Sequence, residues 1–235
     1  MIPSNTAVPK YFAEWREKVN AGIIPVCQKV LRQMDRIQFL IDSPDYYFDN
    51  DAVEGWIEFC ENELVLTNGG DMTILESFKL WAEDALGWYV LVEKEEYVPF
   101  VSRPGGRIVT KKEFRKLIKK QYIIVSRGNA KTMYLYDMHA YELTMLDKTT
   151  HQLVLAPTEA LAWETMSPFV TSISIAKGPL MKFFADGSQY ASNSRARRRT
   201  IAKSGKGIRN FMNNSYMEFR PMGINKVQGF RGDLA

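Results

Sequence analysis

A short stretch in the middle of the chain constrains the fold more than any other. Residues 122–125 read Tyr-Ile-Ile-Val, which is the composition of a buried β-strand. A turn of small residues follows. Lys131 and Thr132 then open a segment that contains neither Gly nor Pro and has helical spacing of its apolar residues. A strand, a tight turn and a helix that begins with Lys-Thr are the layout of a phosphate-binding loop, or P-loop.

The chemistry of such a loop gives each part a role. Backbone N–H groups surround the phosphate oxygens, the lysine reaches the β- and γ-phosphates, and the hydroxyl ligates Mg²⁺. The general pattern has glycine six residues and one residue before the lysine, where this chain has Val125 and Ala130. The alternative is a chance turn between a strand and a helix. The candidate ATP-binding residues are Ser126, Arg127, Gly128, Asn129, Ala130, Lys131 and Thr132, with Thr132 as the Mg²⁺ ligand.

The elements that follow the loop predict an α/β fold. Residues 152–155 and 215–220 have strand-like patterns, and Thr158 is a suitable N-cap for a helix from Glu159 to about Met166. Alternating strands and helices are typical of a parallel sheet covered by helices. We therefore expect a P-loop NTPase-type parallel sheet flanked by helices. We expect this sheet to be incomplete and to follow a mainly helical N-terminal segment.

The pattern divides the chain into three parts. Residues 1–98 form the helical segment, residues 99–120 a loop and a basic helix that begins at Lys111, and residues 121–235 the P-loop core. Within the first part, apolar spacing predicts helices at 11–19, 26–41, 51–64 and 73–88, and a strand at 90–97.

Charge is distributed unevenly along the chain. From Asp42 to Glu96 there are 15 acidic residues and two lysines, which is typical of a solvated helical surface. From Arg195 to Arg231 there are ten basic residues and one acidic residue, which favours contact with a polyanion over a merely solvated loop. The candidate DNA-binding residues are Arg195, Arg197, Arg198, Arg199, Lys203, Lys206 and Arg209.

Several classes of protein are disfavoured by the sequence. Cys27 and Cys60 are too few for a disulfide framework, which favours a reducing compartment. No secretory signal precedes the first helix, and no apolar run approaches the roughly 18 residues of a membrane span. His139 and His151 lack partners at zinc-ligand spacing, so His139 is expected to be packed on its helix.

Residues 125–132 resemble the divergent Walker A motif of tailed-phage terminase large subunits, the motors that package DNA. That family places an arginine four residues before the lysine, as Arg127 stands here, and often lacks the first glycine. Residues 153–158 resemble the strand and helix start after Walker A, and residues 215–231 resemble the run that leads to the Walker B strand. The resemblance covers most of the chain, from about Val53 onward.

The resemblance implies ATP hydrolysis with Mg²⁺ that drives DNA into a procapsid. Arg127 and Lys131 would be the catalytic residues, with Arg127 stabilising transition-state charge as an arginine finger does. The implied partners are double-stranded DNA, the portal protein, the small terminase subunit and further copies of the chain in a homo-oligomer. The implied location is the host cytoplasm, without membrane association.

The same resemblance implies that the Walker B carboxylates and a C-terminal nuclease lie beyond residue 235. We therefore expect this chain alone to bind ATP weakly and to hydrolyse very little. Two alternatives remain. One is a helicase-like P-loop NTPase, and the other is a non-catalytic DNA-binding module that uses the basic 195–209 loop.

Overall fold

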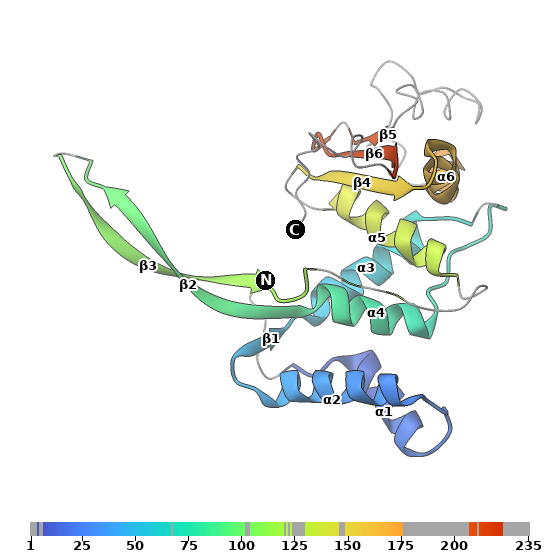
Figure 1. Cartoon of the computed structure of the whole chain (residues 1–235), viewed down its shortest axis with the longest axis horizontal. Helices are drawn as coiled ribbons and strands as arrows, with labels where there is room; N and C mark the ends of the chain where they lie inside the picture. The colour runs from blue at the N-terminus through green and yellow to red at the C-terminus, as the bar shows by residue number, and fades with distance from the viewer. Residues whose placement is uncertain are drawn as a thin grey trace. The chain divides into compact units, whose positions relative to one another are not determined.

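The computed structural model describes ten ranges of the 235-residue chain (Figure 1). They are residues 4, 7–66, 68–101, 104–119, 121, 123, 130–145, 149–175, 207–210 and 212–222. In these ranges the chain forms six helices and two three-stranded sheets, which is an α/β fold. The chain divides into two compact units, Met1–Gly55 with Leu75–Gln121, and Trp56–Ile74 with Tyr122–Ala235. Each unit is described by itself.

The four helices predicted for the N-terminal part are present. They are α1 (Lys10–Asn20), α2 (Gln28–Asp42), α3 (Asn50–Glu63) and α4 (Glu76–Leu86), and α3 passes into the second unit at Trp56. A carboxylate from α4 caps α1. Glu83 accepts hydrogen bonds from the backbone N–H groups of Tyr11 at 2.8 Å and Phe12 at 2.7 Å. Helix geometry leaves these first N–H groups without an intrahelical partner.

The first sheet is antiparallel, with strand order β1-β2-β3. Its strands are β1 (Tyr46–Phe48), β2 (Trp88–Pro99) and β3 (Gly106–Lys116). The predicted strand at 90–97 is confirmed and is longer than expected. The helix predicted from Lys111 is wrong, because those residues belong to β3 and pair with β2. Lys, Arg and Glu favour helices in isolation, but the long cross-strand ladder overrides that preference.

The second sheet is mixed, with strand order β4-β6-β5. Strand β4 (His151–Ala156) runs parallel to β6 (Tyr216–Pro221), while β5 (Gly207–Arg209) runs antiparallel to β6. The predicted strands at 152–155 and 215–220 are thus confirmed, as is one parallel pairing. The larger P-loop sheet is not established. Within the predicted strand at 122–125 the structure describes only Ile123, which lies in neither a helix nor a strand.

Two helices of this unit are α5 (Lys131–Met145) and α6 (Glu159–Ile175). One face of the sheet is buried, through Val154, Met217, Phe219 and Ile208, each at most 6% exposed. Trp163 of α6 meets Phe219 edge to face, with ring centroids 5.0 Å apart. Tyr216 lies on the other, half-buried face, as the alternation of a strand requires.

The segment Trp56–Ile74 completes the core of the second unit. Two aromatic pairs connect it to α5, Trp56 with Tyr134 at 5.8 Å and Phe59 with Tyr141 at 5.6 Å between ring centroids. The backbone N–H of Val65 donates to the Ser172 hydroxyl of α6 at 2.8 Å. Residues 75–121 separate this segment from the rest of the unit, so the core depends on contacts between parts of the chain that are far apart in sequence.

Candidate nucleotide-binding site

The Lys-Thr pair lies at the start of α5, as predicted. Lys131 is the first helical residue, and both Lys131 and Thr132 are exposed. The carbonyl of Ala130 accepts the first hydrogen bonds of the helix, from the N–H of Met133 at 2.8 Å and of Tyr134 at 3.2 Å. The first turn of a helix presents N–H groups and a partial positive charge, which favours an anion at this position.

Ala130 has a φ of +48°, in the left-handed region that favours glycine. The general P-loop pattern has glycine at this position. The backbone here therefore has a conformation of the kind that a glycine would adopt without strain, and alanine adopts it at a cost of roughly 1–2 kcal/mol. A β-branched residue would fit less well.

The rest of the predicted loop lies outside the described residues. This applies to Ser126, Arg127, Gly128 and Asn129, and the structure brings together only Ala130, Lys131 and Thr132 of the predicted set. In the described ranges, no three His, Cys, Asp or Glu side chains gather as metal ligands. Thr132 offers an exposed hydroxyl, which suits Mg²⁺ held mainly by the phosphates of a nucleotide.

The other end of α5 is held by hydrogen bonds. Asn210 Nδ2 donates to the Leu143 carbonyl at 2.9 Å, and Asn213 Nδ2 donates to the same oxygen at 3.2 Å. One turn before Leu143 in the helix, His139 Nδ1 lies 3.0 Å from Gln152 Oε1 on β4. Burial lowers the pKa of His139, so the ring is neutral at pH 7. The prediction that His139 is packed is confirmed.

Asp137 was missed by sequence reasoning. Its side chain is fully buried on the inner face of α5, and neither carboxyl oxygen has a hydrogen-bond partner within the described part of the chain. Burial raises the pKa of Asp137 to about 8. The spacing of Asp137 from the buried Tyr134 and Ala140, three residues to either side, was the signal that could have identified it.

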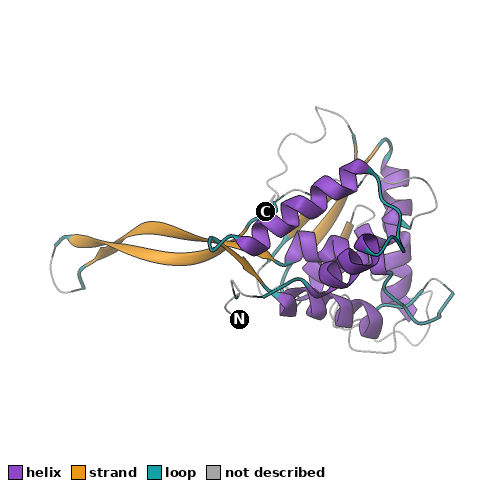
Figure 2. Ribbon diagram, turned by 90° about the horizontal axis from the view of Figure 1, so that it is seen from below, coloured by secondary structure: helices purple, strands orange, loops and turns teal. Residues whose placement is uncertain are grey.

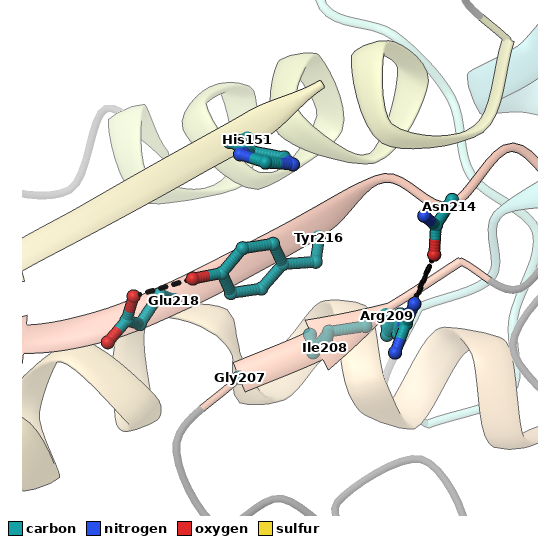
Figure 3. A pocket seen from close by; sticks show the side chains of 7 residues that line it. All are labelled: His151, Gly207, Ile208, Arg209, Asn214, Tyr216 and Glu218. Carbon is teal, nitrogen blue, oxygen red and sulfur yellow. Dashed lines mark hydrogen bonds between the residues drawn. The ribbon is translucent and has the colours of Figure 1, made fainter. Parts of the chain in front are cut away.

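A pocket of about 510 Å³ opens on the half-buried face of the second sheet (Figure 3). The Tyr216 hydroxyl donates to Glu218 Oε2 at 2.8 Å, and Arg220 Nε donates to Glu218 Oε1 at 2.7 Å. The rings of His151 and Tyr216 meet edge to face at 5.1 Å. The pocket is lined by His151, Gly207, Ile208, Arg209, Asn214, Tyr216 and Glu218.

The pocket and the Lys-Thr pair are separate places. His151 and Tyr216 are the first residues of two parallel strands, whereas α/β sheets bind phosphates at the carboxyl ends of their strands. The pocket also adjoins the loop that binds the Leu143 carbonyl, near the C-terminal end of α5. The 15 residues of α5 span about 22 Å, at 1.5 Å per residue.

Of the predicted DNA-binding residues, only Arg209 is described. It is exposed, and its Nε donates to Asn214 Oδ1 at 3.1 Å. The predicted residues Arg195, Arg197, Arg198, Arg199, Lys203 and Lys206 lie outside the described ranges.

Comparison of the chain with protein-family models, with curated proteins and with solved structures found no match. Within the part of the chain that the structure describes, no helix has the length and apolar character of a membrane span.

Proposed function

We propose that the start of α5 binds the phosphates of ATP, and that the chain is the ATP-binding portion of a phage terminase large subunit. The observation that carries the proposal is the arrangement of three consecutive residues. Lys131 and Thr132 are exposed in the first turn of a helix, directly after Ala130 in a left-handed conformation. This geometry supports anion binding by the helix N-terminus together with a lysine.

Each residue has a defined task in this proposal. The Lys131 ammonium group binds the β- and γ-phosphates, and the Thr132 hydroxyl holds the Mg²⁺ that neutralises their charge. By the sequence resemblance, Arg127 stabilises charge on the γ-phosphate, as arginine fingers do. DNA, the portal protein, the small terminase subunit and further copies of the chain are the proposed partners in the host cytoplasm.

Nucleotide binding by the chain tests the proposal. We expect titration with a fluorescent ATP analogue to show Mg²⁺-dependent binding that unlabelled ATP competes for better than AMP. Lys131→Ala should weaken binding roughly 10- to 100-fold, because a hydrogen bond to a charged group contributes about 1.5–3 kcal/mol. Thr132→Val should remove the Mg²⁺ dependence, whereas Thr132→Ser, which keeps a hydroxyl, should retain it.

Lys29→Ala is the matched control. Lys29 is an exposed lysine on α2, so the variant removes the same charge at another place. It should bind the analogue as the unchanged chain does. Equal affinity of the Lys131→Ala variant and the unchanged chain contradicts the proposal.

For the motor itself, the proposal expects the reading frame after Ala235 to encode an apolar strand that ends in Asp-Glu.

A DNA-binding module is the second candidate, favoured by the surroundings of Arg209. This exposed arginine lines a pocket with the rings of His151 and Tyr216, and arginine with aromatic rings is a common nucleic-acid contact. The two candidates differ in a direct assay. A DNA-binding module binds labelled DNA but shows no Mg²⁺-dependent binding of the ATP analogue, whereas the ATP-binding portion of a motor binds the analogue and loses affinity for it in the Lys131→Ala variant.

A further inference from the structure

The β2–β3 hairpin of the first unit extends far beyond its support in that unit. Strand β1 pairs with β2 only from Trp88 to Val90, whereas β2 and β3 pair as far as Pro99 and Gly106. Residues 93–97 and 110–112 are exposed. Figures 1 and 2 show the two strands side by side, with no other described segment of the same unit along their outer halves.

A two-stranded ribbon of this kind has little stability by itself in water, and a third strand supplies what it lacks. Two backbone hydrogen bonds at the ends of the ladder fix which backbone groups are available for a third strand. Phe100 N–H donates to the Gly105 carbonyl, and Leu117 N–H donates to the Trp88 carbonyl, both at 2.9 Å. These bonds identify Trp88–Leu117 and Phe100–Gly105 as hydrogen-bonded pairs of the ladder. Hydrogen-bonded and non-hydrogen-bonded pairs alternate along an antiparallel ladder. Glu95 and Thr110 are therefore a non-hydrogen-bonded pair, and their N–H groups point away from the hairpin.

The two outer edges carry opposite charge. Strand β2 holds Glu93, Glu95 and Glu96 against one lysine. Strand β3 holds five basic residues against one glutamate. Within the hairpin these charges form the ion pairs Glu96–Lys111 and Glu93–Lys112, the second at 3.3 Å. A β2 edge set beside a β3 edge would therefore be attractive, whereas two β3 edges would repel each other.

The far end of the hairpin also exposes apolar side chains. Tyr97 and Ile108, which are directly opposite in the ladder, are 62% and 67% exposed, and Val101 is completely exposed. Apolar groups gathered at one end of an exposed ribbon are typical of a contact surface.

We propose that the hairpin is an assembly arm, in which the β3 edge of one copy of this chain pairs with the β2 edge of the next. The charge difference between the two edges selects this pairing. The contact is heterologous, since different surfaces of the two copies meet, and such contacts build rings or open chains instead of closed dimers. The hairpin belongs to the first unit, so this pairing does not depend on nucleotide binding by α5.

Proline at the outward positions tests the arm. Glu95→Pro blocks the β2 edge and Thr110→Pro blocks the β3 edge, and neither removes a hydrogen bond within the hairpin, because proline is tolerated where the N–H faces outward. We expect the unchanged chain to associate over roughly 1–100 μM in sedimentation velocity, and association to weaken between about 0.05 and 0.5 M NaCl. Each proline variant alone should stay largely monomeric, because every contact between two of its copies then includes a blocked edge, and its association constant should fall at least tenfold.

Mixing the two variants gives the decisive result. The open β2 edge of the Thr110→Pro variant fits the open β3 edge of the Glu95→Pro variant, so the mixture should form a dimer and stop there. Thr110→Ala, which keeps the N–H group, should associate as the unchanged chain does. Circular dichroism and thermal unfolding confirm that each variant is folded. A monomeric unchanged chain, association that ignores both prolines, or association lost to only one of them would overturn the proposal.

Discussion

Asp137 carries a carboxyl group that burial keeps protonated. Its neighbours on α3 and α5 include Cys60 and Tyr136, and burial raises the pKa of both of these groups as well. An ionised carboxylate at this position would be strongly unfavourable without a partner. Asp137 therefore links the packing of α5, the helix that begins with Lys131, to pH.

The pH dependence of stability has a definite sign. The carboxyl of Asp137 has a pKa of about 8 in the folded chain and about 3.9 in an unfolded one, so the folded state holds the extra proton between these values. The free energy of unfolding should therefore fall as pH rises from 4 to 8, by up to about 1.4 kcal/mol per pH unit from this group. Asp137→Asn should remove that part of the slope in urea unfolding at several pH values.

Tyr136→Phe is the control for this prediction. It removes a buried hydroxyl group from the neighbouring position of α5, and burial keeps that hydroxyl from ionising in this range. The variant should keep the pH slope of the unchanged chain. An Asp137→Asn variant with an unchanged slope would show that the carboxyl is ionised in the folded state.

Helix α6 shows how single elements are fixed by local chemistry. The Thr158 hydroxyl accepts a hydrogen bond from the Leu161 N–H at 3.1 Å, which confirms the predicted N-cap. The helix continues past Pro168, beyond the predicted end at about Met166. Pro168 cannot donate to the Glu164 carbonyl, and the Ser167 hydroxyl donates to that oxygen instead, at 2.9 Å.

Two threonines of this region should respond in opposite directions. Thr158→Ala should lower the free energy of unfolding by about 1 kcal/mol, because the cap is lost. Thr165→Ala should raise it by about 0.5 kcal/mol, because alanine has the higher helix propensity. The Thr165 hydroxyl only donates to the Leu161 carbonyl within the helix. Urea unfolding of the two variants measures both changes, and equal effects would contradict the assigned cap.

At the scale of the whole molecule, the second compact unit does not begin at the sequence boundary. Its core includes Trp56, Cys60 and Leu64, each at most 1% exposed, although the rest of the unit begins only at Tyr122. Burying a large apolar side chain contributes about 1.5–3 kcal/mol, so Trp56 and Leu64 together contribute an amount comparable to the lower end of a typical domain's total stability.

A chain that comprises only residues 121–235 should therefore not unfold cooperatively. A second chain, in which a Gly-Ser linker joins Ile74 to Tyr122 and which begins at Trp56, should regain a cooperative urea transition. Comparison of the two chains by circular dichroism and urea titration makes the test. A cooperative transition for residues 121–235 alone would show that Trp56–Ile74 is dispensable.

Local patterns predicted much of this fold and part of the candidate site. Helical spacing identified α1 to α5, alternation identified β4 and β6, and the Lys-Thr pair was placed correctly at a helix start. These features depend on residues a few positions apart, whose side chains share a helix face or a strand face in any context. Thr158 is of the same kind, because a cap acts within one turn.

Long-range packing decided what the sequence could not. Strand β3 looked like a basic helix because its Lys, Arg and Glu residues favour helices, and only the ladder with β2 makes it a strand. Asp137 has the pattern of an ordinary polar residue in the sequence, and only the packing around α5 excludes water from its carboxyl group. The segment that closes the second core comes from Trp56–Ile74, far away in sequence. Pairing and burial between distant segments add free energy that no local window contains. For this reason the sequence determined most of the helices and two of the strands, while the tertiary structure decided the strand character of β3, the burial of Asp137 and the partners of each element.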